Sequence, residues 1–496
     1  MTTRRLASAL LGIGLFAMAL HPTLDPDMWW HLRTGRLILE EGIPRHDPFS
    51  YTMSGREWIA HEWLSEVVMW GIYRAGGLPG LMVAFALLIA LTFWLVYRTC
   101  AGRPFLAALV VLLAASASAF VFGPRPQIFN LFMTALFVYV VERWKAGGTD
   151  RRVLWLLPFL TIVWANLHSG FLVGVVLLAT YTVGEATQRW IAPAGQRTMS
   201  TAAVRELGMV SVASFLAAAL NPNGIELWVY PFFTLGSPSM QSIIREWQSP
   251  DFHRSVFWPF GGVMALGVVS LLWSRERPTA TEALLFLGTA AAGLMSLRHI
   301  PLFAVVSAPA IARHLLGSVG HPRLHDVLSG RAPAAVQPRV FGWLNRAILA
   351  LALFAAGGWM ADRITDNDDV IRAAFPVAAV EFLERTGLTG ARGFNSYNWG
   401  GYLIWRGVPV FVDGRADLYG DQFLFDYDQT ARLGERWEQA LDEFDVEYVI
   451  VEPGGRLPIV LTLSGEWREA YRDDVARILV RNDVRTLGSP RQESEP

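Results

Sequence analysis

Long apolar segments recur along the whole chain and constrain its fold more than any other feature. A helix that crosses a bilayer needs about 20 mostly apolar residues. The candidate segments are Leu6–Leu20, Leu78–Tyr97, Phe105–Phe122, Ile128–Val141, Val153–Ala165, Phe171–Thr187, Leu207–Leu220, Val256–Trp273, Ala283–Leu297, Ile300–Leu316 and Ala347–Ala361. This recurrence predicts a polytopic α-helical membrane protein with about eleven spans.

The composition agrees with a membrane protein that also has a soluble part. Of the 496 residues, 53% are hydrophobic and 17% are charged, whereas a soluble domain has about 25% charged residues. The 20 tryptophans are typical of membrane interfaces. The formal net charge of −1 indicates no nucleic-acid partner. The single cysteine, Cys100, excludes an internal disulfide framework.

The basic residues between the segments predict the orientation, because cytoplasmic loops carry an excess of lysine and arginine. If Arg4 and Arg5 lie inside, every second loop is rich in these residues. Those loops hold Arg98, Arg103, Arg143, Lys145, Arg151, Arg152, Arg189, Arg197, Arg205, Arg275, Arg277, Arg313, Arg323, Arg331, Arg339 and Arg346. The N-terminus is therefore predicted inside and the C-terminal tail outside.

Two alternatives bear on this topology. The first segment could be a signal peptide with a cleavage site at Ala17-Met18-Ala19; we interpret it as the first span because the later segments need it. Residues 61–76 are apolar but short. If they crossed the membrane, all later loops would invert, and we interpret them as a helix at the membrane surface.

The loop after the first segment, residues 21–77, opens with "DPDMWWHL". Asp25 and the proline after it are typical of a helix N-cap with proline at the first helical position. Gly42 is expected to end that helix. A second helix is expected from His61 and Glu62. The loop is thus predicted to hold two amphipathic surface helices.

Polar and ionisable residues near the span ends gather on the outer face in this topology. Such groups are costly at membrane depth and mark functional sites by default. They include Arg125, Asn166, His168, Asn221, Asn223, Glu246, Asp251, Arg298 and His299. Arg298 ends one apolar segment and adjoins the next, so a helix start there would add its positive end to a phosphate site.

Each of these residues has a structural alternative. Asp25 could act as a helix cap alone, although capping does not exclude catalysis. His168 is more typical of a hydrogen-bonded structural histidine than of a ligand. His61 and Glu62 lack the HExxH spacing of a zinc-binding helix.

The character of the chain changes near Asp362, where the apolar runs shorten and charges rise. Helix-like and strand-like stretches alternate from there. This alternation predicts a membrane domain over residues 1–361 and a small α/β domain over residues 362–488. Residues 489–496 are expected to be disordered.

Two stretches of this α/β domain carry specific expectations. "VPVFVDGRADLYG" is interpreted as a strand whose carboxyl end bears Asp413 and Arg415, where α/β folds place ligands. A structural ion-paired turn is the alternative. "WREAYRDDVARILVRN" is expected to form a hairpin that turns at Asp473-Asp474.

This arrangement resembles the GT-C superfamily of membrane glycosyltransferases, such as protein O-mannosyltransferases and aminoarabinose transferases. The resemblance rests on "DPDMWWHLRTG", "HEWLSEVVMWGIYRAGGLPG", "WANLHSGFL", "NPNGIELWVYPF", "EWQSPDFH" and "NWGGYLIWRGVPVFVDGRADLYG". It covers the whole chain in layout and is similar to an uncharacterised bacterial branch. It implies a protein of the bacterial inner membrane, with a cytoplasmic N-terminus and a periplasmic C-terminal domain.

The resemblance also implies a reaction, in which a sugar on a polyprenyl-phosphate carrier moves to a periplasmic glycan, lipid or protein acceptor. Asp25 or Asp27 would be the general base, and the choice between them stays open because the loop lacks the Asp-Glu pair of many mannosyltransferases. Arg298, with His299 and Arg125, would hold the donor phosphate. A divalent metal held by the two aspartates and histidines is compatible with the sequence but not required by it.

Further candidate residues and rival functions complete these expectations. The candidate substrate-binding residues are His31, His61, Glu62, Asn166, His168, Glu246, Asp413 and Arg415. The rivals are another lipid-linked transferase or ligase, a transporter, and a non-catalytic assembly protein. Transporters place ionisable groups near the bilayer midplane and have internal repeats, and the sequence has neither feature.

Overall fold

The computed structural model describes residues 1–100, 104–192, 198–329 and 339–484. The expected disordered tail, residues 489–496, lies outside the described residues. The chain divides into two compact units. The helical unit comprises residues 1–21, 79–232 and 244–364. The mixed unit comprises residues 22–78, 233–243 and 365–496.

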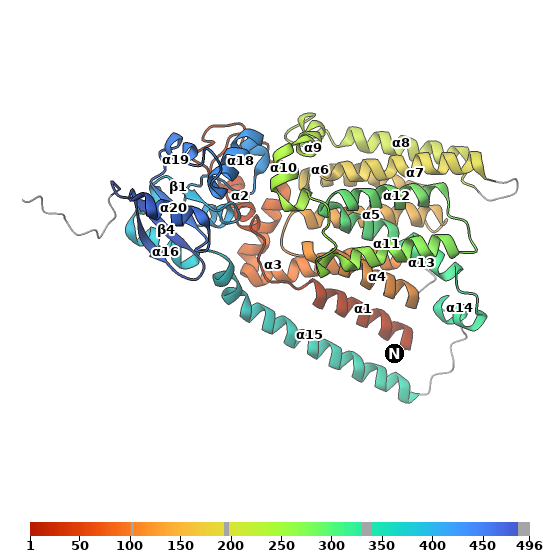
Figure 1. Ribbon diagram of the computed structural model, residues 1–496. Helices are drawn as coiled ribbons and strands as arrows, with labels where there is room; N and C mark the ends of the chain where they lie inside the picture. The colour runs from red at the N-terminus through yellow and green to blue at the C-terminus, as the bar shows by residue number, and fades with distance from the viewer. Residues whose placement is uncertain (101–103, 193–197, 330–338, 485–496) are drawn as a thin grey trace, which may run out of the picture. The chain divides into compact units, whose positions relative to one another are not determined.

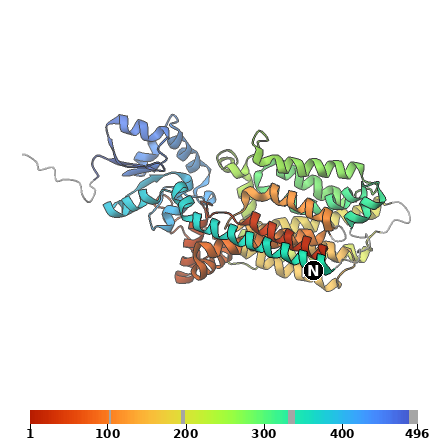
Figure 2. The same cartoon turned by 90° about the horizontal axis from the view of Figure 1, so that it is seen from below.

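Helices form at all the predicted apolar segments. The helical unit contains α1 (Thr3–Ala19), α4 (Pro104–Ser118), α5 (Gln127–Lys145), α6 (Leu156–Leu167), α7 (Phe171–Ile191), α8 (Thr201–Ala217), α11 (Trp258–Trp273), α12 (Ala280–Met295), α13 (Ile300–Gly317) and α14 (Pro322–Ser329). Three more helices contribute residues to both units: α3 (Trp63–Thr99), α9 (Glu226–Gly236) and α15 (Arg339–Ala374). Figures 1 and 2 both show most of the long helices of the helical unit running side by side.

Helix α13 forms the centre of the helical unit. It packs against α4, α5, α11 and α12, and Phe303 and Ile311 on it are fully buried. The apolar part of α15, in contrast, is not buried, and Phe354 on it is 82% exposed. Large apolar side chains that face outward in this way need a hydrocarbon environment, so the fold is that of a polytopic membrane protein.

Six of the described helices are long and apolar enough to cross a membrane. They are Trp63–Thr99, Pro104–Val121, Phe171–Ile191, Ser255–Trp273, Leu297–Gly317 and Phe341–Ala374. Ala280–Met295 is apolar but shorter. The larger number of about eleven spans stays a prediction, because several predicted segments form helices that are short for a full crossing.

The mixed unit combines short helices with a four-stranded sheet. The strands are β1 (Gly393–Asn395), β2 (Tyr448–Val451), β3 (Trp467–Arg472) and β4 (Arg477–Arg481), in the order β1-β2-β4-β3. Strands β1 and β2 are parallel and the other pairs are antiparallel. The remaining helices are α2 (Met28–Glu41), α10 (Pro238–Ile243), α16 (Val377–Thr386), α17 (Gly400–Trp405), α18 (Ala416–Arg432), α19 (Gln439–Glu443) and α20 (Arg456–Ser464).

The sheet confirms one predicted element and corrects another. The hairpin forms as β3 and β4, with the Asp473 amide donating to the Ala476 carbonyl across the turn. The predicted strand before Asp413 is not a member of the sheet. Instead, its Val410 forms a parallel bridge with Ser50 of the first outer loop. The apolar run signals a buried extended chain, but it does not encode which partner satisfies the backbone.

The first outer loop consists mainly of two helical stretches. Gly42 follows the last residue of helix α2, and its φ of 95° is one that glycine adopts more readily than other residues. Helix α3 is interrupted at Gly77, where a φ of 61° separates the stretch that begins at Trp63 from the apolar stretch that contains Pro79. Residues 22–78 belong to the same compact unit as residues 365–496, so this loop and the C-terminal residues form one body.

Candidate active site

The acidic turn Asp25–Asp27 directly precedes α2. The Asp25 carboxylate accepts a hydrogen bond from the Asp27 amide at 2.9 Å, which closes a tight Asx turn. The Asp27 carboxylate accepts one from the indole nitrogen of Trp30 at 3.1 Å. The expected N-cap at Asp25 is corrected: Asp27 occupies the N-cap position and makes no side-chain capping bond. Both aspartates are partly exposed.

Two glycines of the C-terminal residues receive this turn. A Cβ atom on Gly401 would lie 2.2 Å from the Pro26 carbonyl oxygen, and one on Gly414 would lie 1.7 Å from a carboxylate oxygen of Asp27. A side chain at Gly401 would displace the backbone of the turn, and one at Gly414 would displace the Asp27 carboxylate, because real Cβ atoms do not approach so closely. The glycines of "NWGG" and "VDGR" therefore allow the turn to pack closely on the C-terminal residues.

The tryptophans after the turn attach α2 to the same C-terminal residues. The Trp29 ring meets the rings of Phe375, Tyr402 and Trp405 at centroid distances of 5.7, 5.2 and 6.1 Å. The Trp30 ring lies over His31, with centroids 3.6 Å apart. Aromatic contacts of this kind stabilise beyond simple area burial. The "MWWH" stretch thus anchors α2 and the carboxylates that precede it.

A buried group of histidines and glutamates joins α2 to the beginning of α3. The Nδ1 atom of His31 lies 3.1 Å from Glu66 and its Nε2 atom 3.6 Å from Glu62. His61 lies 3.6 Å from the other Glu62 oxygen. Burial alone would lower the pKa of His61, but the charge and hydrogen bond of Glu62 outweigh it and raise that pKa. Three predicted substrate-binding residues therefore meet in one cluster.

Asp413 and Arg415 form a buried ion-pair network. The Arg415 guanidinium donates to both Asp413 oxygens at 2.8 and 2.7 Å and to Asp47 of the first outer loop at 2.7 Å. The Tyr419 hydroxyl donates to Asp413 at 2.7 Å. The rings of Phe49 and Trp58 lie 5.1 and 4.7 Å from the guanidinium carbon.

The residues of this network are buried, and the arginine is paired with two carboxylates. The Arg415 side chain is 1% exposed and that of Asp413 is 0% exposed. Burial alone would lower the pKa of Arg415, but its two carboxylate partners raise it above its usual value. Burial, together with the charge of Asp413, raises the pKa of Tyr419. These residues therefore hold the first outer loop against the C-terminal residues rather than face a ligand.

Asp47 is the member of this network that sequence reasoning did not assign. Its carboxylate accepts hydrogen bonds from the Phe49 and Ser50 amides at 3.1 and 2.9 Å, as well as from the Ser50 hydroxyl. The "DPFS" stretch carries the local signal, since an aspartate commonly bonds the amide two residues on. Its partner Arg415, 368 residues away, has no local signal.

The helical unit holds a separate basic cluster. The 3-10 turns Arg245–Trp247 and Leu297–His299 pack together. Arg125 forms an ion pair with Glu246, and the Arg298 Nε atom lies 3.8 Å from the other Glu246 oxygen. The Arg298 guanidinium also stands over the Trp247 ring at 4.9 Å, and the His299 ring lies 6.5 Å from that ring.

This cluster is accessible to solvent. Both guanidinium groups contact the Glu246 carboxylate, and the side chains of Arg125, Arg298 and Glu246 are 17, 25 and 34% exposed. Guanidinium groups suit a phosphate, which they bind through paired hydrogen bonds. Topology alone predicted that Arg125, Glu246, Arg298 and His299 gather, and the structure brings these four together.

Asn166 and His168 lie at the end of α6. The Asn166 side-chain amide donates to the carbonyls of Ile162 at 2.8 Å and Leu220 at 3.0 Å, and so ties α6 to the turn that follows α8. The His168 Nδ1 atom accepts a hydrogen bond from the Gly170 amide at 2.7 Å. Nδ1 therefore carries no proton, and the ring is the Nε2–H tautomer. Both side chains are buried, and their bonds organise the turn between two helices.

A metal ion does not fit the residues that the structure describes. Among them, no group of three or more His, Cys, Asp or Glu side chains is arranged to hold one. His31 and His61 contact Glu62 and Glu66.

Comparisons with known proteins identify the fold. No protein-family model and no curated protein sequence matches this chain. The oligosaccharyltransferase AglB from Archaeoglobus fulgidus, solved in complex with an inhibitory peptide and a dolichol-phosphate, matches 90% of this chain and 69% of its own, at 12% identity and a TM-score of 0.58. ArnT from Cupriavidus metallidurans, bound to undecaprenyl phosphate, matches 98% of both chains at 12% identity and a TM-score of 0.52.

ArnT in its apo state is similar as well, over 94% of this chain and 95% of its own, at 13% identity and a TM-score of 0.51. AglB and ArnT are both GT-C membrane glycosyltransferases. The chain therefore has the GT-C fold, which confirms the fold that the sequence resemblance implied.

Proposed function

We propose that this chain, with its GT-C fold, is a membrane glycosyltransferase that moves a sugar from a polyprenyl-phosphate carrier to a periplasmic acceptor. The observation that carries the proposal is the acidic turn Asp25–Asp27, which packs closely on Gly401 and Gly414 and whose aspartates are partly exposed. The similar structures support the carrier class, since one was solved with a dolichol-phosphate and the other with undecaprenyl phosphate.

The acidic turn supplies the base in this proposal. A carboxylate of Asp25 or Asp27 takes the proton from an acceptor hydroxyl while that oxygen forms a bond to the anomeric carbon of the donor sugar. The bond between that carbon and the phosphate oxygen breaks at the same time, and its electron pair leaves with the polyprenyl phosphate. A single displacement of this kind inverts the anomeric centre.

The basic cluster receives the leaving group. Negative charge grows on the bridging phosphate oxygen as the bond breaks, and guanidinium groups stabilise it. Arg298 and Arg125 fill this role, and Glu246 holds the two side chains in place between turnovers. Helix α13 starts at Ile300, directly after Arg298 and His299, so its N-terminal amides add positive potential.

A reconstituted transfer assay tests the proposal. Purified protein in proteoliposomes is given undecaprenyl phosphate carrying a single labelled hexose or pentose, together with a periplasmic extract as acceptor. We expect release of undecaprenyl phosphate and a labelled product of inverted configuration. No release with any donor sugar, from protein that binds undecaprenyl phosphate, would contradict the transfer reaction.

The orientation of the chain in the bacterial inner membrane is part of the proposal. Alkaline phosphatase, which is active only in the periplasm, can be fused after Asp362 or after Arg152. We expect activity from the first fusion alone, because the basic loops favour a cytoplasmic N-terminus. The reverse pattern would move both candidate clusters to the cytoplasmic side.

A further inference from the structure

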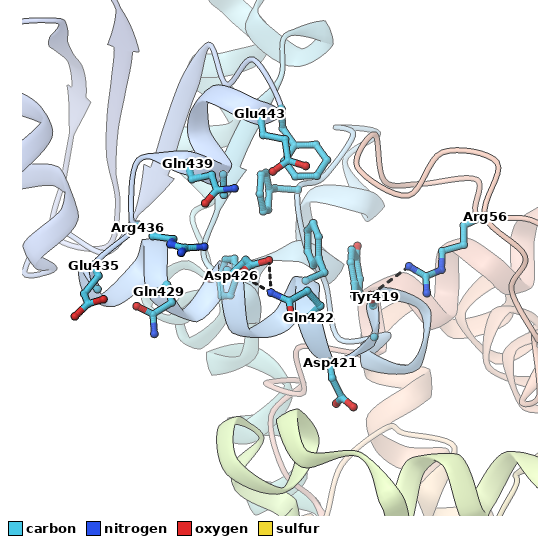
Figure 3. A pocket seen from close by; sticks show the side chains of 17 residues that line it. Arg56, Tyr419, Asp421, Gln422, Asp426, Gln429, Glu435, Arg436, Gln439 and Glu443 are labelled. Atoms are coloured by element: carbon cyan, nitrogen blue, oxygen red, sulfur yellow. Dashed lines mark hydrogen bonds between the residues drawn. The ribbon is translucent and has the colours of Figure 1, made fainter.

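A hollow lies within the mixed unit, among α18, α19 and Arg56 of the first outer loop, and the proposed transfer reaction does not use it. Its volume is about 870 Å³, in the range of about 300–1,000 Å³ that ligand pockets have. Figure 3 shows the residues that line it. None of them belongs to the acidic turn or to the Arg415 network except Tyr419.

Aromatic rings form the floor of this hollow. Phe411 stands at the centre, with the Phe423 and Phe444 rings each 5.3 Å away, and the Tyr419 ring stacks on Phe423 at 5.1 Å. Phe411 is fully buried, whereas Phe423 and Phe444 are half-buried. The half-buried rings offer an apolar surface on which a flat ligand can pack.

The rim is far more polar than the lining of an ordinary apolar ligand pocket. It carries carboxylates, side-chain amides and guanidinium groups: Asp421, Asp426, Glu435 and Glu443; Gln422, Gln429 and Gln439; Arg56 and Arg436. In Figure 3 the labelled rim side chains come from α18 and the α19 region, and Arg56 comes from the first outer loop. Asp421 points instead toward α10, where Ser237 and Ser239 donate to it at 2.6 Å each.

This combination fits the chemistry of a sugar. A pyranose ring has an apolar C–H face that packs on aromatic rings, and hydroxyl groups that both donate and accept hydrogen bonds. The rim offers acceptors, donors and amides that do both, and Gln422 donates to both Asp426 oxygens at 3.0 Å. Its four carboxylates and two arginines have a formal charge of −2, which disfavours phosphate-bearing ligands and lipids.

We propose that this hollow is an acceptor subsite that binds a neutral or amino-sugar glycan. The inference rests on the proposed glycosyltransferase function and names the acceptor class for it. The glycan lies with a sugar face on Phe423 and Phe444, and its hydroxyl groups bond the rim amides and carboxylates. The hollow thereby holds the acceptor on the same unit as the acidic turn.

Direct binding tests the inference without any need for turnover. Full-length protein in detergent is titrated with mannotriose, maltotriose and chitotriose, and binding is measured by calorimetry and ligand-observed NMR. We expect at least one trisaccharide to bind. The double variant Gln422→Ala/Gln439→Ala should weaken that binding at least about tenfold, because each lost hydrogen bond contributes about 1 kcal/mol. Glu438→Ala, an exposed neighbour outside the lining, is the matched control and should bind normally.

The possible outcomes separate this inference from the proposed function. Undecaprenyl-phosphate binding is measured on the same samples and should be equal in the wild type and the double variant. Lack of binding to all three trisaccharides, equal binding by the double variant, or selective binding of a lysine-rich peptide would each overturn the glycan subsite. Trisaccharide binding that depends on the rim, in protein that does not bind undecaprenyl phosphate, would uphold the subsite and count against the proposed donor.

Discussion

Arg415 of the mixed unit and Arg298 of the helical unit are both arginines beside carboxylates, yet their surroundings differ. Arg415 has two carboxylate partners within 2.8 Å, two aromatic rings over its guanidinium, and almost no contact with solvent. Arg298 lies 3.8 Å from the Glu246 carboxylate, which Arg125 also contacts, and its side chain is 25% exposed. A buried, closely paired charge stabilises the structure, whereas an accessible one can bind a ligand.

The same contrast separates the carboxylates. Asp413 is enclosed by Arg415 and Tyr419, whereas Asp25 and Asp27 are partly exposed on a turn. Substitutions at the two kinds of residue should therefore have different consequences. Changes at the buried residues should alter stability, and changes at the accessible ones should alter activity or binding with little loss of stability.

The largest effect is expected at the acidic turn. Asparagine retains an acceptor oxygen for the Trp30 indole and the Asp27 amide, so Asp25→Asn and Asp27→Asn should fold normally. One of them should lower the transfer rate by about a hundredfold to ten-thousandfold, because the base is lost. Rates are measured in proteoliposomes, with Glu57→Gln, an exposed residue of the same loop, as control. Near-normal transfer by the double variant would show that the turn has only a structural role.

The second effect concerns stability. Arg415→Ala would leave Asp47 and Asp413 buried without their cation, and breaking a buried pair in this way costs about 3–5 kcal/mol. Thermal unfolding in detergent, followed by tryptophan fluorescence, should show a large decrease. Arg392→Ala is the control, because its pair with Asp445 is exposed and such pairs contribute about 0–1 kcal/mol. Equal losses from the two variants would remove the distinction between buried and exposed arginines.

The sequence predicts this contrast only in part, because the partner residues are far apart along the chain. The apolar runs predict the helices, and the gathering of Arg125, Glu246 and Arg298 follows from their places at span ends. The pairing of Arg415 with Asp47 joins residues 368 positions apart, and no local pattern encodes it.

The stretch before Asp413 shows the same limit in the backbone. Its apolar residues indicate a buried extended chain, but the Val410 amide and carbonyl bond Phe49 and Tyr51 instead of a neighbouring strand of the sheet. The side chain of Asn395 supplies further bonds to Phe411 and Val412. Extended conformation can be predicted from residue type, whereas the choice of partner depends on the assembled unit.

The third effect tests the accessible arginine. Arg298→Ala should weaken undecaprenyl-phosphate binding about tenfold to a hundredfold, since a charge-assisted hydrogen bond contributes about 1.5–3 kcal/mol. Thermal stability should change little. Arg298→Lys should restore binding only in part, because an ammonium group cannot reproduce the two-pronged contact. Unchanged affinity in nanodiscs, with intact folding, would show that Arg298 only anchors the start of α13.

The smallest effect is expected at Asp421, a partly exposed carboxylate that has a structural role because it accepts hydrogen bonds from two serines. Hydrogen bonds from Ser237 and Ser239 lower the pKa of Asp421 below its ordinary value of 3.8. A carboxylate whose pKa is lower in the folded state stabilises the fold above its unfolded pKa, and that contribution disappears as the pH falls through the folded pKa. The unfolding temperatures of wild type and Asp421→Asn, measured at pH 6 and at pH 3, should therefore differ at pH 6, with wild type higher, and the difference should be smaller at pH 3. A difference that persists or grows on acidification would mean that the ionised carboxylate does not hold Ser237 and Ser239.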